Sequence, residues 1–262
     1  MKNELDWICT IFVITVSGLI CTSSGSLFRQ CSRSVAPINP TSHNLIIKTY
    51  RSITMKLTTQ NIELYLKQLQ ETVAQLPVEP IDQMIKILLE CAWAGRKVFI
   101  FGNGGSASTA SHFACDLAKN TIVQGAPRFR VIALNDNVPL MTAWGNDTAY
   151  DNIFAEQLTS LVEAGDVVIG ISCSGNSANV LKAMAVARKH KATTIALTGD
   201  QGGRLKEMVD LCITVSSSRI EQQEDVHLIL EHCICVAIRD QFTQNYLLVP
   251  RKVTDMLAPE VV

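Results

Sequence analysis

Hydrophobic residues follow two different spacings along most of the chain. Between residues 57 and 95 they recur at helical spacing, with a break at Pro77 and Pro80 that predicts two helices in a hairpin. Beyond Gly95, short apolar runs predict strands at 97–102, 130–135, 166–171, 193–197 and 211–215, and the amphipathic stretches between them predict helices at 106–119, 149–163, 177–190 and 222–242. Apolar strands that alternate with helices are typical of a parallel sheet covered on both faces. We therefore expect a three-layer α/β sandwich, preceded by a helical hairpin.

The first 54 residues differ in character from the rest. The stretch Trp7–Cys21 is apolar and uncharged but shorter than the ~20 residues that cross a bilayer, which favours a signal-type segment over a membrane helix. Met55 begins a sequence that is an ordinary protein start. We interpret residues 1–54 as an N-terminal extension that is artefactual, disordered or targeting. The main domain is expected over residues 55–243, with a peripheral tail over 244–262.

Composition narrows the class of protein. Hydrophobic residues make up 47% of the chain, enough for a full core, and 23 basic residues against 24 acidic ones give a formal net charge of −1. Without a basic excess, no nucleic acid is expected as partner, and no membrane is expected either. The nine cysteines are scattered and odd in number, which favours reduced thiols and a cytoplasmic location.

Two loops rich in glycine and serine each follow a predicted strand and precede a predicted helix. Small residues at such a point let backbone N–H groups and hydroxyls approach a phosphate. The expected contacts are Asn103, Gly104, Gly105 and Ser106 in the first loop and Ser172, Cys173, Ser174 and Ser177 in the second. For Cys173 we expect the backbone amide, rather than the thiol, to contact the phosphate.

A dinucleotide site is the first alternative for these loops. Gly102, Gly104 and Ala107 satisfy the loose G-x-G-x-x-A pattern. A dinucleotide fold also needs an acidic residue ~20 positions further on, at the end of the next strand, and Asp136 lies beyond that distance. The hydroxyls of the second loop suit a compact phosphomonoester. We favour a phosphosugar and expect no dinucleotide; a purely structural turn is the remaining alternative.

Five motifs together resemble the SIS (sugar isomerase) domain of bacterial phosphoheptose isomerases. They are Gly102-Asn103-Gly104-Gly105-Ser106, His112-Phe113-Ala114, Trp144-Gly145-Asn146-Asp147, the run Gly170 to Val180, and Leu197-Thr198-Gly199 with Gly202-Gly203. The resemblance covers roughly residues 57–242. It implies a flavodoxin-like fold, a homotetramer, and interconversion of sedoheptulose 7-phosphate and glycero-manno-heptose 7-phosphate.

The resemblance also assigns an acid and a base, which moving a carbonyl between two sugar carbons requires. Asp116 stands where the family has a catalytic Glu and is the expected base, and His232 is the expected acid. His112 lies four residues before Asp116, so both share one helix face. The alternatives are a solvated helix carboxylate for Asp116 and a hydrogen-bonded core histidine for His232.

A zinc ion is implied at four of these positions. His112, Asp116, Glu224 and His232 would form a two-histidine, two-carboxylate set suited to zinc. Glu224 stands where the family has a Gln that contacts substrate and metal. The resemblance also implies that Asn146 and Asp147 contact substrate; the alternative is an N-cap role for Asp147.

The resulting hypothesis is a cytoplasmic phosphosugar isomerase. One alternative is a non-catalytic SIS module that binds phosphosugars or a protein partner, as replication-initiator-associating proteins of the superfamily do. The other is isomerisation or epimerisation of a different phosphosugar, motivated by Asp116 and Glu224.

Overall fold

Five parallel strands form the central sheet, in the order β2-β1-β3-β4-β5. The computed structural model describes residues 40–248, so the expectations for residues 1–39 and 249–262 lie outside it. The strands are β1 (Lys97–Gly102), β2 (Arg130–Ala133), β3 (Val167–Ser172), β4 (Thr193–Gly199) and β5 (Leu211–Val215). All five predicted strands are confirmed, and the order is that of flavodoxin-like sheets.

Helices alternate with the strands along the chain. They are α2 (Pro40–Ala74), α3 (Val78–Trp93), α4 (Gly105–Lys119), α5 (Val138–Asp147), α6 (Ala155–Leu161), α7 (Ala178–Lys189), α8 (Gly203–Met208) and α9 (Ile220–Leu248), with a 3-10 turn η1 (Tyr150–Asn152). The single helix predicted over 149–163 is wrong, because the chain there forms η1 and the shorter α6. Helix α5 is an addition to the prediction: Asn137 accepts a bond from the Leu140 N–H, and Pro139 occupies the first turn.

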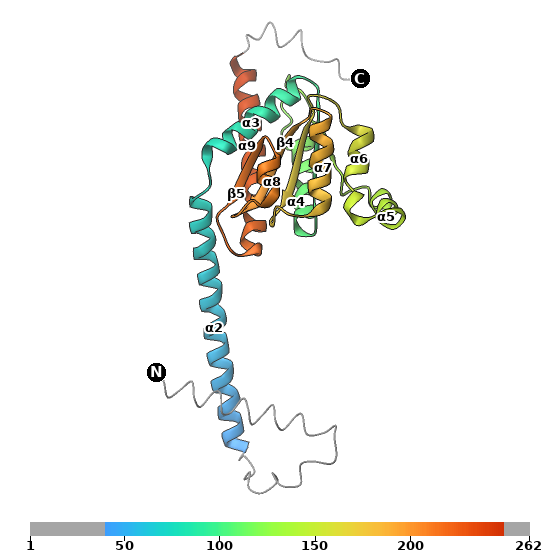
Figure 1. Cartoon of the computed structure of the whole chain (residues 1–262). Helices are drawn as coiled ribbons and strands as arrows, with labels where there is room; N and C mark the ends of the chain where they lie inside the picture. Colours follow the sequence, from blue (N-terminus) through green and yellow to red (C-terminus); the bar gives the residue numbers. More distant parts are fainter. Residues whose placement is uncertain (1–39, 249–262) are drawn as a thin grey trace. The chain divides into compact units, whose positions relative to one another are not determined.

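Helices cover both faces of the sheet, which confirms the three-layer sandwich (Figure 1). Alternate strand residues divide between two cores, since Val98 and Ile100 pack with α3, α4 and α9, whereas Phe99 and Phe101 pack with α6 and α7. Every residue of β3 is buried, as a central parallel strand requires.

The two N-terminal helices are confirmed, although α2 begins earlier than predicted. The chain divides into two units at Asn61 and Ile62, within α2. In the second unit, Tyr65 of α2 donates to Asp225 of α9 at 2.5 Å. The boundaries expected at residues 54 and 243 stay predictions. Over residues 40–248, no helix combines the length and hydropathy needed to cross a membrane.

The two glycine- and serine-rich loops meet where the strand order reverses. Gly102 at the end of β1 pairs with Ile171 near the end of β3, and β2 lies on the other side of β1. In open α/β sheets this reversal forms the crevice in which ligands bind.

Replacement of Gly175 tests how tightly the second loop is packed. Gly175 has φ +61°, and a Cβ there would collide with the Gly202 carbonyl oxygen. Gly95 has φ +64° with no atom within 4 Å of such a Cβ. Gly95→Ala should therefore cost only the left-handed backbone strain, about 1–2 kcal/mol, and Gly175→Ala should cost clearly more. Urea denaturation measures both, and equal losses would contradict this packing.

Candidate active site

A reciprocal pair of side-chain amides joins the two loops. Asn103 Nδ2 donates to Asn179 Oδ1 at 2.9 Å, and Asn179 Nδ2 donates back to Asn103 Oδ1 at 2.8 Å. Asn179 is buried, and its Oδ1 also accepts the Val180 N–H. Tyr150 adds a third hydrogen bond by donating to Asn103 Oδ1 at 3.1 Å. Neither Asn179 nor Tyr150 is among the residues predicted for the site, although Asn179 lies in one of the motifs.

The second loop presents hydroxyls at the start of α7. The Oγ atoms of Ser172 and Ser177 are 3.2 Å apart, and Ser174 Oγ accepts the Asn176 N–H. Ser177 is the N-cap residue of α7, but its side chain caps no backbone N–H. The first-turn amides of α7 therefore remain available to an anion. The loop is held from behind by the Gly199 N–H, which donates to the Cys173 carbonyl at 3.0 Å.

Glu224 lies against the first loop. A Cβ on Gly105 would be 2.5 Å from Glu224 Oε1, so a side chain there would require the Glu224 carboxylate to move. Burial, and secondly the Glu224 carboxylate, raise the pKa of the Cys173 thiol, which hydrogen-bonds with Ser106. The thiol is therefore protonated at neutral pH. We call Gly105, Ser106, Cys173 and Glu224 the loop group.

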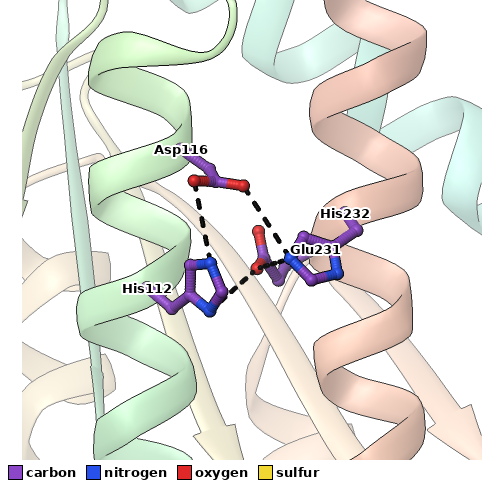
Figure 2. Close-up of side chains that lie close together, drawn as sticks. All are labelled: His112, Asp116, Glu231 and His232. Atoms are coloured by element: carbon purple, nitrogen blue, oxygen red, sulfur yellow. Dashed lines mark ion pairs between the residues drawn. The ribbon is translucent and has the colours of Figure 1, made fainter.

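A second set of side chains converges between α4 and α9. His112 and Asp116 come from α4, and Glu231 and His232 come from α9 (Figure 2). Asp116 Oδ1 lies 3.7 Å from His112 Nε2, and Asp116 Oδ2 lies 3.9 Å from His232 Nε2. Glu231 Oε1 lies 3.6 Å from His112 Nδ1 and 3.2 Å from His232 Nε2. We call these four residues the α4–α9 cluster.

The two carboxylates of the cluster are buried, whereas the two imidazoles are half exposed. The Glu231 side chain is 0% exposed and that of Asp116 is 10% exposed, against 45% for His112 and 49% for His232. Burial, and secondly the charge of Asp116, raise the pKa of Glu231 to about 8. Asp116 Oδ1 also accepts a bond from Asn120 at 2.7 Å.

The structure brings together three of the four residues expected to hold zinc. Glu224 is not in the cluster; it lies seven residues before Glu231, about 10 Å along α9. Glu231 takes its place and is absent from the sequence-based prediction. Its position beside His232 is the signal that could have found it.

The exposed fractions of Asp116 and His232 argue against the alternative roles considered for these two residues. Asp116 is not a solvated helix carboxylate, since it is buried. His232 is not a core histidine, since half of its side chain is exposed. The core histidine is His227, which is fully buried with Nε2 3.2 Å from the Thr198 carbonyl oxygen. The flank of α9 that carries Ile229 and Val236 is the exposed one.

An open cleft of about 310 Å³ adjoins the cluster. It is lined by His112, Asp116, Asn120, His232, Cys235, Val236 and Arg239. Its volume is at the lower end of the range for small-molecule sites.

Asn146 and Asp147 lie at the end of α5 rather than at the start of a helix. The N-cap alternative for Asp147 is therefore wrong. Both residues are exposed, and Asn146 Nδ2 donates to Asp147 Oδ1 at 2.9 Å. The same segment of chain contacts the first loop through Tyr150.

The loop group and the α4–α9 cluster lie at different levels along the same two helices, and the cleft beside the cluster is lined by none of the loop group. Gly105 and His112 are seven residues apart on α4, which corresponds to about 10 Å. Glu224 and Glu231 have the same separation on α9, so the two helices run in parallel past both groups.

Comparison with known proteins gives a consistent set of relatives. The SIS domain profile matches residues 61–199. A phosphoheptose isomerase of Aliarcobacter butzleri is 40% identical over 179 residues, which is 66% of this chain and 93% of that protein. Phosphoheptose isomerase structures from Neisseria gonorrhoeae and Francisella tularensis superpose with TM-scores of 0.64 and 0.65, at 32% and 33% identity. Each covers 72% of this chain, and 99% and 98% of the respective relative.

Burial of His227 predicts how stability depends on pH. Burial lowers the pKa of His227 from 6.5 to about 4, although the Thr198 carbonyl offsets part of the shift. Between pH 4 and pH 6.5 this histidine binds a proton in the unfolded chain but not in the folded chain. The free energy of unfolding therefore falls as the pH falls from 6.5 to 4, by up to about 3 kcal/mol. His227→Gln should make this decline shallower in urea denaturation at stepwise pH. An unchanged slope would contradict the prediction.

Proposed function

This chain belongs to the SIS domain family, and we propose that it is a phosphoheptose isomerase. The reaction is interconversion of sedoheptulose 7-phosphate and D-glycero-D-manno-heptose 7-phosphate through an enediolate. The observation that carries the proposal is the proximity of Asp116 to His232, whose side chains line one open cleft.

The phosphate is assigned to the second loop. Ser174 is exposed and Ser177 half-buried, and both hydroxyls stand beside the uncapped first turn of α7. Hydrogen bonds to a charged phosphate are shorter and stronger than neutral ones. Asn103, Gly104, Gly105 and Ser106 of the first loop are then placed to contact the sugar chain, with Glu224 beside them.

Proton transfer is assigned to the α4–α9 cluster. Starting from the aldose, Asp116 takes the proton from C2 while His232 donates a proton to the carbonyl oxygen at C1, which gives the enediol. Loss of the proton on the C2 oxygen and return of a proton to C1 then produce the ketose. Asp116 has two oxygens, so one can accept the bond from Asn120 while the other faces His232.

The cluster also fits a zinc ion by its donor chemistry. Two imidazoles and buried carboxylates are the borderline nitrogen and oxygen ligands that zinc accepts. A bound ion would polarise the sugar carbonyl as a Lewis acid. We assign His112, Asp116 and His232 to it, as the resemblance implies.

We further propose that four copies assemble and that the protein acts in the cytoplasm. Ile229 and Val236 are exposed on the flank of α9 that carries His232, and burying them against another copy would be favourable. The cysteines whose side chains the structure describes are all free, as a reducing compartment favours.

Deuterium exchange tests the reaction. In deuterated water with sedoheptulose 7-phosphate, the wild type should introduce label at the carbon beside the carbonyl. Asp116→Asn and His232→Gln should each lower kcat by at least about 100-fold, as loss of a general base or acid does. Lys119→Gln, an exposed change on the same helix, should leave kcat unchanged. If the wild type exchanges label with no heptose or hexose phosphate, the non-catalytic module is favoured; exchange with another sugar phosphate alone would assign a different substrate.

Serine replacement tests the phosphate site. The double change Ser174→Ala and Ser177→Ala should weaken binding of the phosphosugar by a few kcal/mol, on the order expected for two charge-assisted hydrogen bonds. Ser160→Ala, an exposed serine at the end of α6, serves as control. Calorimetric titration of Asp116→Asn with substrate, with and without the serine changes, measures binding apart from turnover. Undiminished affinity would remove the phosphate assignment.

A further inference from the structure

One buried carboxylate oxygen of the α4–α9 cluster has no hydrogen-bond donor. Glu231 Oε1 is inaccessible to solvent and is without a partner among the residues that the structure describes. We propose that Glu231, rather than Glu224, is the fourth ligand of the metal site. The proposal rests on the zinc site of the proposed function and is independent of which sugar is the substrate.

The four side chains lie close enough together to surround a single ion. Ligand bonds of 2.0–2.2 Å to zinc place neighbouring ligand atoms about 3.3–3.6 Å apart. Glu231 Oε1 lies 3.2 Å from His232 Nε2 and 3.6 Å from His112 Nδ1. Asp116 faces the other nitrogen of His112, Nε2, at 3.7 Å, so His112 can offer only one of its two nitrogens to an ion. One ligand atom from each residue lies within 4.8 Å of every other.

A divalent cation would compensate the buried Glu231 carboxylate. A carboxylate removed from water is costly unless a donor or an ion compensates. The nearest nitrogens, on His112 and His232, lie at 3.6 and 3.2 Å, but neither makes a hydrogen bond to Oε1. Imidazole nitrogens and carboxylate oxygens are the electron donors that a zinc ion accepts as ligands.

Glu224 of the same chain is too far along α9 to share this ion. The loop group holds its carboxylate against Gly105, where it also raises the pKa of Cys173. Seven residues of helix separate it from Glu231, and His227 between them is fixed in the core beside the Thr198 carbonyl. Reaching the cluster would require α9 to slide by about 10 Å, or two turns.

With Glu231 in place of Glu224, the ligand set still contains two carboxylates. With Asp116 and Glu231 as the carboxylates, a divalent ion and its four ligands are neutral overall, which favours burial of the site. Glu224 is then free to contact the sugar chain beside Gly105.

Matched leucine substitutions distinguish the two glutamates. Leucine supplies no ligand atom at either position, and it suits the buried site of Glu231. Metal-stripped protein is titrated with Zn²⁺ against a competing chelator, and with Co²⁺ while its visible absorption is followed. Glu231→Leu should weaken Zn²⁺ binding by at least about 100-fold, the upper loss seen for outer-shell changes, and alter the Co²⁺ spectrum. Glu224→Leu should keep wild-type affinity and spectrum.

Several results would overturn the proposal. Weakened Zn²⁺ binding in Glu224→Leu would overturn it by itself, even if Glu231→Leu failed to fold. Unchanged Zn²⁺ binding in a folded Glu231→Leu would also overturn it. A wild-type protein that binds no metal would also overturn the proposal about Glu231. If that metal-free protein still isomerises the sugar phosphate, the proposed function is retained. Conversely, loss of Zn²⁺ binding in Glu231→Leu alone supports the proposal even if no heptose phosphate is isomerised.

Discussion

The packing of α4 against α9 is the contact on which the site depends. Helix α4 starts at the first loop, so its first turn is fixed at the reversal of strand order. Helix α9 follows the last strand of the sheet and returns across the same face, within the same core. The two helices run in parallel, and this contact brings His112 and Asp116 next to Glu231 and His232, more than a hundred residues later in the chain. The proposed acid, base and metal ligands all require this contact.

Much of this arrangement could be predicted from the sequence. Apolar runs located all five strands, because a central parallel strand is buried on both faces and shows an uninterrupted hydrophobic pattern. Strand order was beyond reach, since nothing local encodes which strands pair. Short helices are also difficult: α8 has six residues, fewer than two turns of periodic pattern. Helix α5 depends on its N-cap and proline rather than on an apolar stripe, and none of its residues is buried.

Helix α9 shows why the site itself was predicted only in part. Its periodicity separates a polar stripe with His227 and Glu231 from an apolar flank with Ile229 and Val236, but it does not tell which of them faces the core. Val226, Leu230 and Ile234 are buried together with His227 and Glu231, whereas Ile229 and Val236 are exposed. A buried carboxylate is rare unless it is paired, so a residue such as Glu231 is recognised only when its neighbours on α4 are known. Motif comparison identified His112, Asp116 and His232 but assigned Glu224 to a group that lies two turns away.

The amide pair between Asn103 and Asn179 has a chemical consequence for the lifetime of the protein. Asn103 precedes a glycine, and an asparagine in that setting deamidates readily, because the glycine nitrogen can attack the side-chain carbonyl without hindrance from a side chain. Both polar atoms of Asn103 are held by Asn179, and its oxygen is held by Tyr150 as well, so the carbonyl is restrained from turning toward the backbone. Hydrolysis would leave a carboxylate at this position, facing the Asn179 oxygen and adding negative charge to a crevice suited to anions. The hydrogen bonds that align the two loops therefore also slow their chemical ageing.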